Sequence, residues 1–237
     1  MKYIRKSQER GSVDLGWLQS KHSFSFGSYY DPKHMGVSAL RVINDDMVMP
    51  GKGFGTHGHR DMEIISYVMQ GALKHEDSEG NKHTVPAGDV QRMSAGSGVM
   101  HSEYNASNTD QVKFLQIWIQ PNKMGIKPSY EQKSIAQNGP LTPLLTPEGG
   151  ENALSINQDA SLSRLVLNVQ QTFMLASGKQ IGYLHIVKGS VMVDGKEFAA
   201  GDAFAVDPAT ELNLEATAEL EATAELEALW FELPADF

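Results

Sequence analysis

Short apolar runs separated by turn residues extend along the whole chain. Runs rich in Val, Ile, Leu and aromatic residues occupy residues 64–69, 114–119, 182–187 and 203–206. Turn-forming pairs lie between such runs, for example Pro50-Gly51, Lys188-Gly189 and Asp194-Gly195. Many short strands between frequent turns are typical of β-sandwiches and β-barrels. The pattern therefore predicts an all-β protein.

One segment near the C-terminus alternates strictly between apolar and polar positions. From Leu212 to Ala228 every even position is Leu or Ala, and every odd position is Asn, Glu or Thr. The segment contains the six residues ATAELE twice in tandem, at 216–221 and 222–227. Its composition suits a helix, but strict alternation is typical of a half-buried strand. We favour an extended hairpin over a short helix and assign the segment no chemistry.

The length favours two domains. The chain has 237 residues and a mass of 26.0 kDa, which suits two domains of about 100–120 residues each. Residues 129–151 contain several Pro and Gly residues without periodicity, which is typical of a connection. We expect one domain at 1–132 and a second at 133–237.

Charge and cysteine content narrow the possible partners and compartments. The formal net charge is −9, which disfavours direct binding to nucleic acid or to an anionic membrane surface. The chain has no cysteine, so disulfides, thiolate metal sites and cysteine nucleophiles are excluded. No apolar run is long enough for a membrane span, and the first residues do not resemble a secretory signal. We expect a cytoplasmic protein.

Two pairs of potential metal ligands have the same spacing. His57 and His59 stand two residues apart, as do His101 and Glu103. In a strand, residues i and i+2 point to the same face, so two pairs on neighbouring strands could converge on one ion. Three neutral imidazoles and one carboxylate suit a divalent transition metal better than Ca²⁺ or Mg²⁺. Glu63 shares strand parity with His57 and His59, so the pattern alone leaves either glutamate as the carboxylate ligand.

The remaining histidines give no such pattern. We expect them to be surface residues or ordinary core residues: His22, His34, His75, His83 and His185. The second half repeats the strand and turn outline of the first, at 182–189 and 200–202, but it offers His185 without a partner at i+2. We therefore expect no metal in the second domain.

The motifs around these residues resemble a known family. The spacing Gly-x5-His-x-His-x3-Glu, followed by Pro-x-Gly-Asp and His-x3-Asn, resembles the two motifs of the cupin barrel. Within the cupins, residues 24–46, 53–68, 85–105 and 114–121 are similar to the pirin family. The resemblance implies a bicupin, in which two antiparallel β-barrels of jelly-roll type face one another and the first alone binds a metal. It favours His57, His59, His101 and Glu103 as ligands, with Glu63 behind them or facing the core.

The resemblance also implies a reaction. Pirin-like proteins are associated with quercetin 2,3-dioxygenase activity, in which a flavonol ring is opened with O₂. Iron is the expected functional metal, although Zn, Ni, Cu, Co or Mn could be bound on isolation. Glu103 is the candidate base for the flavonol hydroxyl. The flat rings would need apolar walls, for which the candidates are Phe24, Phe26, Phe54, Met62 and Met93.

Two other functions use the same site. Some pirins are regarded as metal-responsive adaptors of transcription factors or enzymes, and such a protein would have a protein partner instead of a substrate. A cupin-type sugar isomerase would need a basic, phosphate-binding pocket, and no cluster of Lys or Arg stands near the ligands. We favour the dioxygenase.

Overall fold

The computed structural model describes residues 1–217 and 225–237, and these residues divide into two compact units. The N-terminal unit comprises Gly11–Ile135 and Pro147–Asp159. The C-terminal unit comprises Met1–Arg10, Ala136–Thr146 and Ala160–Phe237. The unit bounds thus differ from the expected division at residue 132, most clearly in the first ten residues. The extent of the two folding domains remains a prediction.

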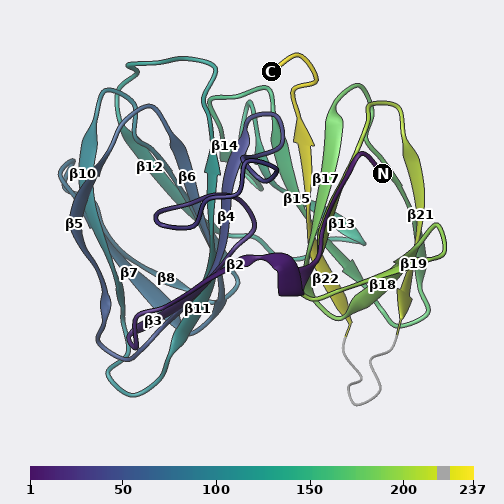
Figure 1. Ribbon diagram of the computed structural model, residues 1–237. Helices are drawn as coiled ribbons and strands as arrows, with labels where there is room; N and C mark the ends of the chain where they lie inside the picture. The colour runs from purple at the N-terminus through teal and green to yellow at the C-terminus, as the bar shows by residue number, and fades with distance from the viewer. Residues whose placement is uncertain (218–224) are drawn as a thin grey trace. The chain divides into compact units, whose positions relative to one another are not determined.

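Two antiparallel sheets form the N-terminal unit (Figure 1). One has the order β12-β9-β6-β11-β4-β3-β2 and the other the order β5-β10-β7-β8. The strands are β2 (Gly11–Asp14), β3 (Leu18–His22), β4 (Leu40–Val48), β5 (Gly53–His59), β6 (Glu63–Gln70), β7 (Ala72–Asp77), β8 (Lys82–Pro86), β9 (Asp89–Ser94), β10 (Val99–Asn105), β11 (Val112–Ile119) and β12 (Ser129–Ser134), with the short β14 (Leu154–Ser155). An apolar cluster at one end of the unit combines residues of both sheets, including Val48, Val68, Leu73 and Phe114. The two sheets therefore pack face to face.

The C-terminal unit has the same plan. One sheet contains β1, β20, β17, β22, β15 and β13 in that order, and the other contains β16, β21, β18 and β19. The elements are β1 (Tyr3–Arg5), the 3-10 helix η1 (Ser7–Glu9), β13 (Leu141–Thr146), β15 (Ser161–Leu167), β16 (Thr172–Ala176), β17 (Ile181–Lys188), β18 (Ser190–Val193), β19 (Lys196–Ala199), β20 (Ala203–Val206), β21 (Glu211–Thr217) and β22 (Leu226–Leu233). Apolar residues of both sheets form one core, with Leu184, Phe204, Leu214 and Trp230 fully buried. The first ten residues belong here because β1 pairs with β20.

The nearly all-β architecture predicted from the apolar runs is confirmed. The runs at 64–69, 114–119, 182–187 and 203–206 lie within β6, β11, β17 and β20. The turn between β18 and β19 is built by Asp194 and Gly195, whose φ angles of 50° and 74° are those of a tight hairpin turn. In the part of the chain that the structure describes, no helix has the length and apolar character of a membrane span. Closure of each pair of sheets into a barrel stays a prediction.

The expectation that residues 129–151 form only a connection was wrong. These residues contain β12 and β13. In β13, Pro143 lies where the register with β15 shifts, a position at which a missing N–H can be tolerated. Strand β12 lacks the clear alternation of buried and exposed residues that would have revealed it.

The alternating segment near the C-terminus was predicted correctly as a strand but not as a hairpin. Strand β21 has the burial pattern that alternation predicts, with Leu212, Leu214 and Ala216 buried. However, β21 pairs with β16 and β18, whereas β22 pairs with β15 and β17. The two flanking strands thus belong to different sheets. Residues 218–224, which carry most of the duplication, lie outside the described residues.

Candidate metal centre

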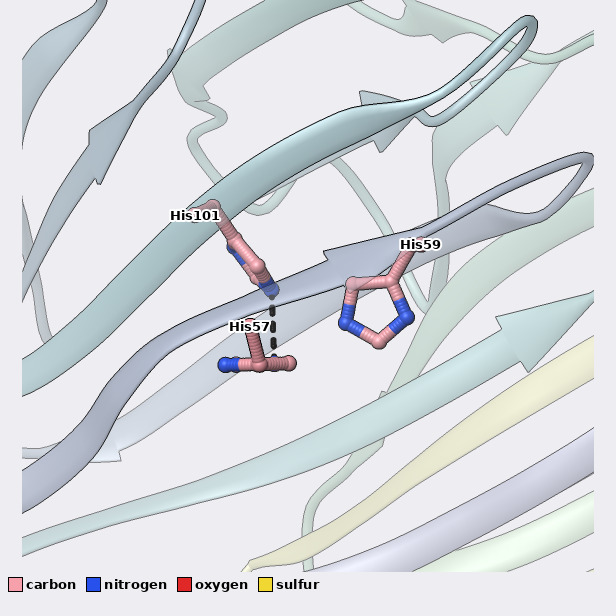
Figure 2. A group of neighbouring side chains, drawn as sticks. All are labelled: His57, His59 and His101. Carbon is pink, nitrogen blue, oxygen red and sulfur yellow. Dashed lines mark hydrogen bonds between the residues drawn. The ribbon is translucent and has the colours of Figure 1, made fainter.

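Strands β5 and β10 bring three histidines together. In this antiparallel pair His101 lies opposite His57, and Val99 lies opposite His59. The alternation of a strand places His57 and His59 on one face, and the register adds His101 to that face. Figure 2 shows the three imidazoles on the same side of the two strands. The predicted convergence of these three residues is therefore present in the structure.

A glycine lets the two strands approach closely. A Cβ atom at Gly53 would lie 2.2 Å from the carbonyl oxygen of Glu103 and 2.5 Å from Cα of Tyr104. Any larger residue at Gly53 would therefore push β5 away from β10. The register also shifts between His101 and Glu103, so these two residues do not continue the regular pairing. The shift is a β-bulge, a feature that re-aims side chains next to functional sites.

The three imidazoles are arranged around a common centre. The ring centroids are 4.5 Å apart for His57 and His101, 4.7 Å for His57 and His59, and 4.9 Å for His59 and His101. One nitrogen of each ring lies within 4.8 Å of the other two, and Nε2 of His57 is 3.1 Å from Nε2 of His101. Nδ1 of His57 is 2.8 Å from the carbonyl oxygen of Gly55, so Nδ1 carries the proton and Nε2 presents a lone pair to the centre.

The electrostatics keep at least two of the rings neutral. Burial, followed by the neighbouring His101 and His57, lowers the pKa of His59 to about 4. Burial, followed by the neighbouring His57 and His75, lowers the pKa of His101 to about 3. Neutral imidazoles with converging lone pairs are the nitrogen ligands that divalent transition metals prefer. The residues present therefore fit such a metal.

Glu103 is fully buried and its carboxylate is held by three neutral donors. Oε1 accepts hydrogen bonds from the Ser66 hydroxyl at 3.1 Å and from Nε2 of Gln91 at 3.0 Å. Oε2 accepts one from Nε2 of Gln116 at 2.6 Å. The Glu103 carboxylate forms a group of potential ligands with His75 and His101, in which each residue offers a ligand atom within 4.8 Å of the others. It does not belong to the group formed by the three histidines. Its role as the fourth ligand stays a prediction.

Glu63 lies elsewhere. Its carboxylate accepts hydrogen bonds from the Ser94 hydroxyl at 2.9 Å and from the backbone N–H of Asn157 at 3.2 Å. The parity argument for Glu63 fails because β5 ends at His59 and β6 begins at Glu63, so the residues are not in one strand. Asp61 between them has a φ of 48°, which turns the chain from one sheet to the other. The alternation of a single strand cannot be counted across this turn.

The sequence analysis missed His75. This residue was expected to be ordinary, but it is fully buried and its ring centroid is 5.3 Å from that of His101. Its Nε2 is 3.0 Å from a carboxylate oxygen of Asp77. His75 lies opposite Glu103 in the pairing of β7 with β10, so only the strand order reveals it. The one sequence signal was the spacing of His75 and Asp77, which matches that of the other two pairs.

The remaining histidines do not join the cluster. His22 packs edge-on against Phe26, and His83 is exposed and stacks on Tyr130. His34 lies 3.9 Å from the carboxylate of Asp31. His185 is buried in the C-terminal unit. The absence of a metal from that unit remains a prediction.

An aromatic pocket is connected to the imidazoles through Trp118. The indole of Trp118 lies edge-on to His59, with ring centroids 4.9 Å apart, and edge-on to Phe26, with ring centroids 5.3 Å apart. A pocket of about 350 Å³ is lined by Ser25, Phe26, Gly27, Tyr29, Tyr30, Met35, Arg41, Val42, Met62 and Trp118. This volume is at the lower end of the range of small-molecule sites.

Of the five apolar residues proposed as walls, two line this pocket. Phe26 and Met62 do so. The other three are core residues in the described structure. Phe24 and Met93 are buried, and Phe54 packs against Trp17 in the apolar cluster.

Two family models match the chain. Residues 3–119 match the family model described as Pirin, and residues 144–233 match the one described as Quercetinase C-terminal cupin domain. The chain is 47% identical to "Quercetin 2,3-dioxygenase" of Escherichia coli (strain K12), over 82% of this chain and 85% of that protein. It is 45% identical to "Pirin-like protein" of Caulobacter vibrioides, over 78% and 82% of the two chains.

Solved structures extend the likeness to the whole chain. The crystal structure of the bacterial pirin YhhW from Escherichia coli in complex with nickel(II) aligns with a TM-score of 0.91. The two sequences are 42% identical, and the alignment covers 99% of each chain. These matches confirm the resemblance seen in the motifs, and the chain belongs to the pirin family.

Proposed function

We propose that this chain is a metal-dependent dioxygenase that opens the central ring of a flavonol with O₂. The observation that carries the proposal is the convergence of three imidazoles, His57, His59 and His101, beside an aromatic pocket. The relatives named quercetin 2,3-dioxygenase support the substrate class. The nickel complex of YhhW supports a divalent metal, and we propose iron as the functional one because O₂ chemistry suits it.

The three imidazoles and Glu103 would hold the metal, which when bound supplies Lewis acidity and a site for O₂ chemistry. Because the pKa values of His59 and His101 lie well below 6.5, these ligands need no deprotonation at neutral pH. In the overall reaction both atoms of O₂ enter the ring-opened product, and one ring carbon leaves as carbon monoxide.

Glu103 would take the proton of the flavonol hydroxyl. A carboxylate has roughly four acceptor positions, and the hydrogen bonds from Ser66, Gln91 and Gln116 use three of them. One position therefore stays available for the metal bond, and the carboxylate would accept the proton there after shifting off the metal. These three donors are uncharged, so they orient the carboxylate without supplying a cation to neutralise it.

The pocket beside Trp118 would hold the flavonol rings. Its walls include the aromatic rings of Phe26, Tyr29 and Trp118, against which a planar ring system can stack. Since Trp118 also contacts His59, a ring bound there would lie close to the metal ligands.

The test compares Glu103→Gln with the native protein at matched iron content. The amide keeps the size and one oxygen but cannot accept the proton, so we expect flavonol turnover and carbon monoxide release to fall by at least about 10²-fold. Glu63→Gln is the control, because this buried carboxylate lies outside both groups of potential ligands, and it should retain activity.

Equal rates in the native and Glu103→Gln proteins would remove Glu103 as the base. If the native protein shows no turnover with any of several metals, the dioxygenase proposal fails and the adaptor function is favoured.

A further inference from the structure

The buried pair His75 and Asp77 has an unexplained feature. Nδ1 of His75 is buried and, among the residues that the structure describes, it has no hydrogen-bond partner. Leaving a buried polar atom unpaired is unfavourable, because the atom has lost its hydrogen bonds to water. An unpaired atom of this kind in a folded protein requires an explanation.

The tautomer of His75 can be assigned from its partner. The Asp77 carboxylate accepts hydrogen bonds from the backbone N–H groups of Glu79 and Asn81 and from the side-chain amide of Asn81, at 2.9–3.1 Å. Burial raises the pKa of Asp77, but the hydrogen bonds from His75 and Asn81 outweigh it and hold this pKa below its usual value. Asp77 is therefore an acceptor, so Nε2 of His75 must carry the ring proton. Nδ1 of His75 then carries no proton and presents an acceptor lone pair to the interior.

A ring nitrogen of His101 is in the same situation. Its Nδ1 is also buried and has no hydrogen-bond partner among the described residues. Its Nε2 is the nitrogen that lies 3.1 Å from Nε2 of His57, toward the centre of the three imidazoles. When Nε2 of His101 binds a metal, Nδ1 must carry the proton and becomes a buried donor that needs an acceptor. His57 already has such an acceptor in the carbonyl oxygen of Gly55.

The separation of the two rings fits a direct contact. The centroids of His75 and His101 are 5.3 Å apart. An N–H···N hydrogen bond of about 2.9 Å between two imidazoles gives roughly this separation, since each nitrogen lies about 1.2 Å from its ring centre. The ring planes meet at 53° and the two Nδ1 atoms are not hydrogen-bonded as the rings stand, so the bond requires the rings to turn.

We propose that Asp77 and His75 form a positioning relay for the metal ligand His101, in which Nδ1 of His75 accepts a hydrogen bond from the protonated Nδ1 of His101. The proposal rests on the proposed function in one respect, namely that His101 binds the metal through Nε2. His75 is a positioning residue and touches neither substrate nor metal. The relay fixes the tautomer and the ring plane of a ligand whose Nδ1 has no hydrogen-bond partner among the described residues. Loss of such a partner typically weakens metal binding by 10- to 100-fold.

The experiment is a titration of the metal-stripped protein with Ni²⁺ by calorimetry, for the native chain and three variants. His75→Leu should weaken Ni²⁺ binding by about 10-fold or more. His75→Gln should recover a good part of the affinity, since its side-chain oxygen can accept the His101 proton. His83→Leu is the control, because His83 contacts the same Tyr130 ring but is exposed, and it should bind as the native protein does.

A second measurement reports the hydrogen bond directly. In the Zn²⁺-loaded protein, which is diamagnetic, nitrogen-15 spectra of the histidine rings should show a proton on Nδ1 of His101. The chemical shift of this proton should differ between the native protein and His75→Leu. A role in folding alone would lower the unfolding temperature without moving this resonance or separating the Gln and Leu variants.

The outcomes separate the two proposals. If the native chain binds neither Ni²⁺ nor Zn²⁺, the metal site itself is wrong. If the native chain binds metal and His75→Leu binds it equally well, the relay is wrong while the metal site stands. Equal loss in His75→Leu and His75→Gln would also contradict the relay, because the acceptor would then not matter.

Discussion

At the scale of single residues, the spacing of histidines in the sequence corresponds to a real convergence of side chains. His57 and His59 share a strand face, and a neighbouring strand supplies His101 opposite His57. His101 is buried and the other two imidazoles are partly buried, and the three rings contact one another. Truncating one of them should therefore remove affinity without disturbing the fold at large.

Alanine substitution tests this expectation. His101→Ala should remove most of the bound metal, measured by metal analysis of the folded protein, because a three-imidazole site loses one of its nitrogen donors. His57→Ala and His59→Ala should have the same effect. His185→Ala is the comparison, since it removes a buried histidine of the other unit, and its metal content should equal that of the native chain. Full metal retention in His101→Ala, or about two ions per native chain, would contradict the expectation.

At the scale of elements, the site depends on how closely β5 and β10 approach. The close contact of Gly53 with the backbone of Glu103 and Tyr104 sets this distance. A register slip of one residue would turn His57 and His59 to the opposite face, away from His101. Gly53 is therefore part of the site although it carries no functional group.

Two alanine substitutions in the same strand separate this effect from a general effect on strand stability. Gly53→Ala should lower metal affinity and stability together, because its Cβ atom would meet backbone atoms at 2.2–2.5 Å that cannot move separately. Gly55→Ala is the control, because the nearest atom to its Cβ would be the Tyr104 hydroxyl at 3.7 Å, an ordinary contact. Metal titration and thermal unfolding of both variants provide the comparison. Similar results for the two variants would show that close approach at Gly53 is unimportant.

At the scale of the whole molecule, the stability of the C-terminal unit should depend on pH through a histidine with no metal role. His185 is buried, and burial, followed by the charge of Arg10, lowers its pKa to about 3. In the unfolded chain this pKa is about 6.5. Between these values the unfolded chain binds the proton and the folded chain does not, so acid favours unfolding. The contribution of neutral His185 to the free energy of unfolding is therefore complete above pH 6.5 and declines as the pH falls toward 3.

Replacing His185 with leucine should flatten this dependence. A single group of this kind changes the free energy of unfolding by at most about 1.4 kcal/mol per pH unit. Between pH 7 and pH 5 the native chain should thus lose about 2 kcal/mol more than His185→Leu, measured by urea unfolding of both proteins at each pH. Parallel losses in the two proteins would show that His185 is not held in its neutral form.

Local features of this protein follow from short stretches of its sequence. Apolar runs and turn residues predicted the strands because backbone conformation and burial of one face depend on nearby residues. The i, i+2 spacing of His57 and His59 predicted that they share a strand face for the same reason. The alternation before residue 218 predicted the strand β21, although it could not predict which strands β21 would pair with.

The contacts between distant residues depend on strand pairing in the folded chain. His75 lies next to His101 because β7 pairs with β10, and Glu63 lies apart because the chain changes sheets after His59. Strand pairing brings together residues that are separated along the chain, so no spacing within one segment reports it. The surroundings of Glu103 have the same origin, since Ser66, Gln91 and Gln116 come from three further strands. A strand's own sequence sets the face on which a ligand lies, and the packing of the sheets sets what that ligand can contact.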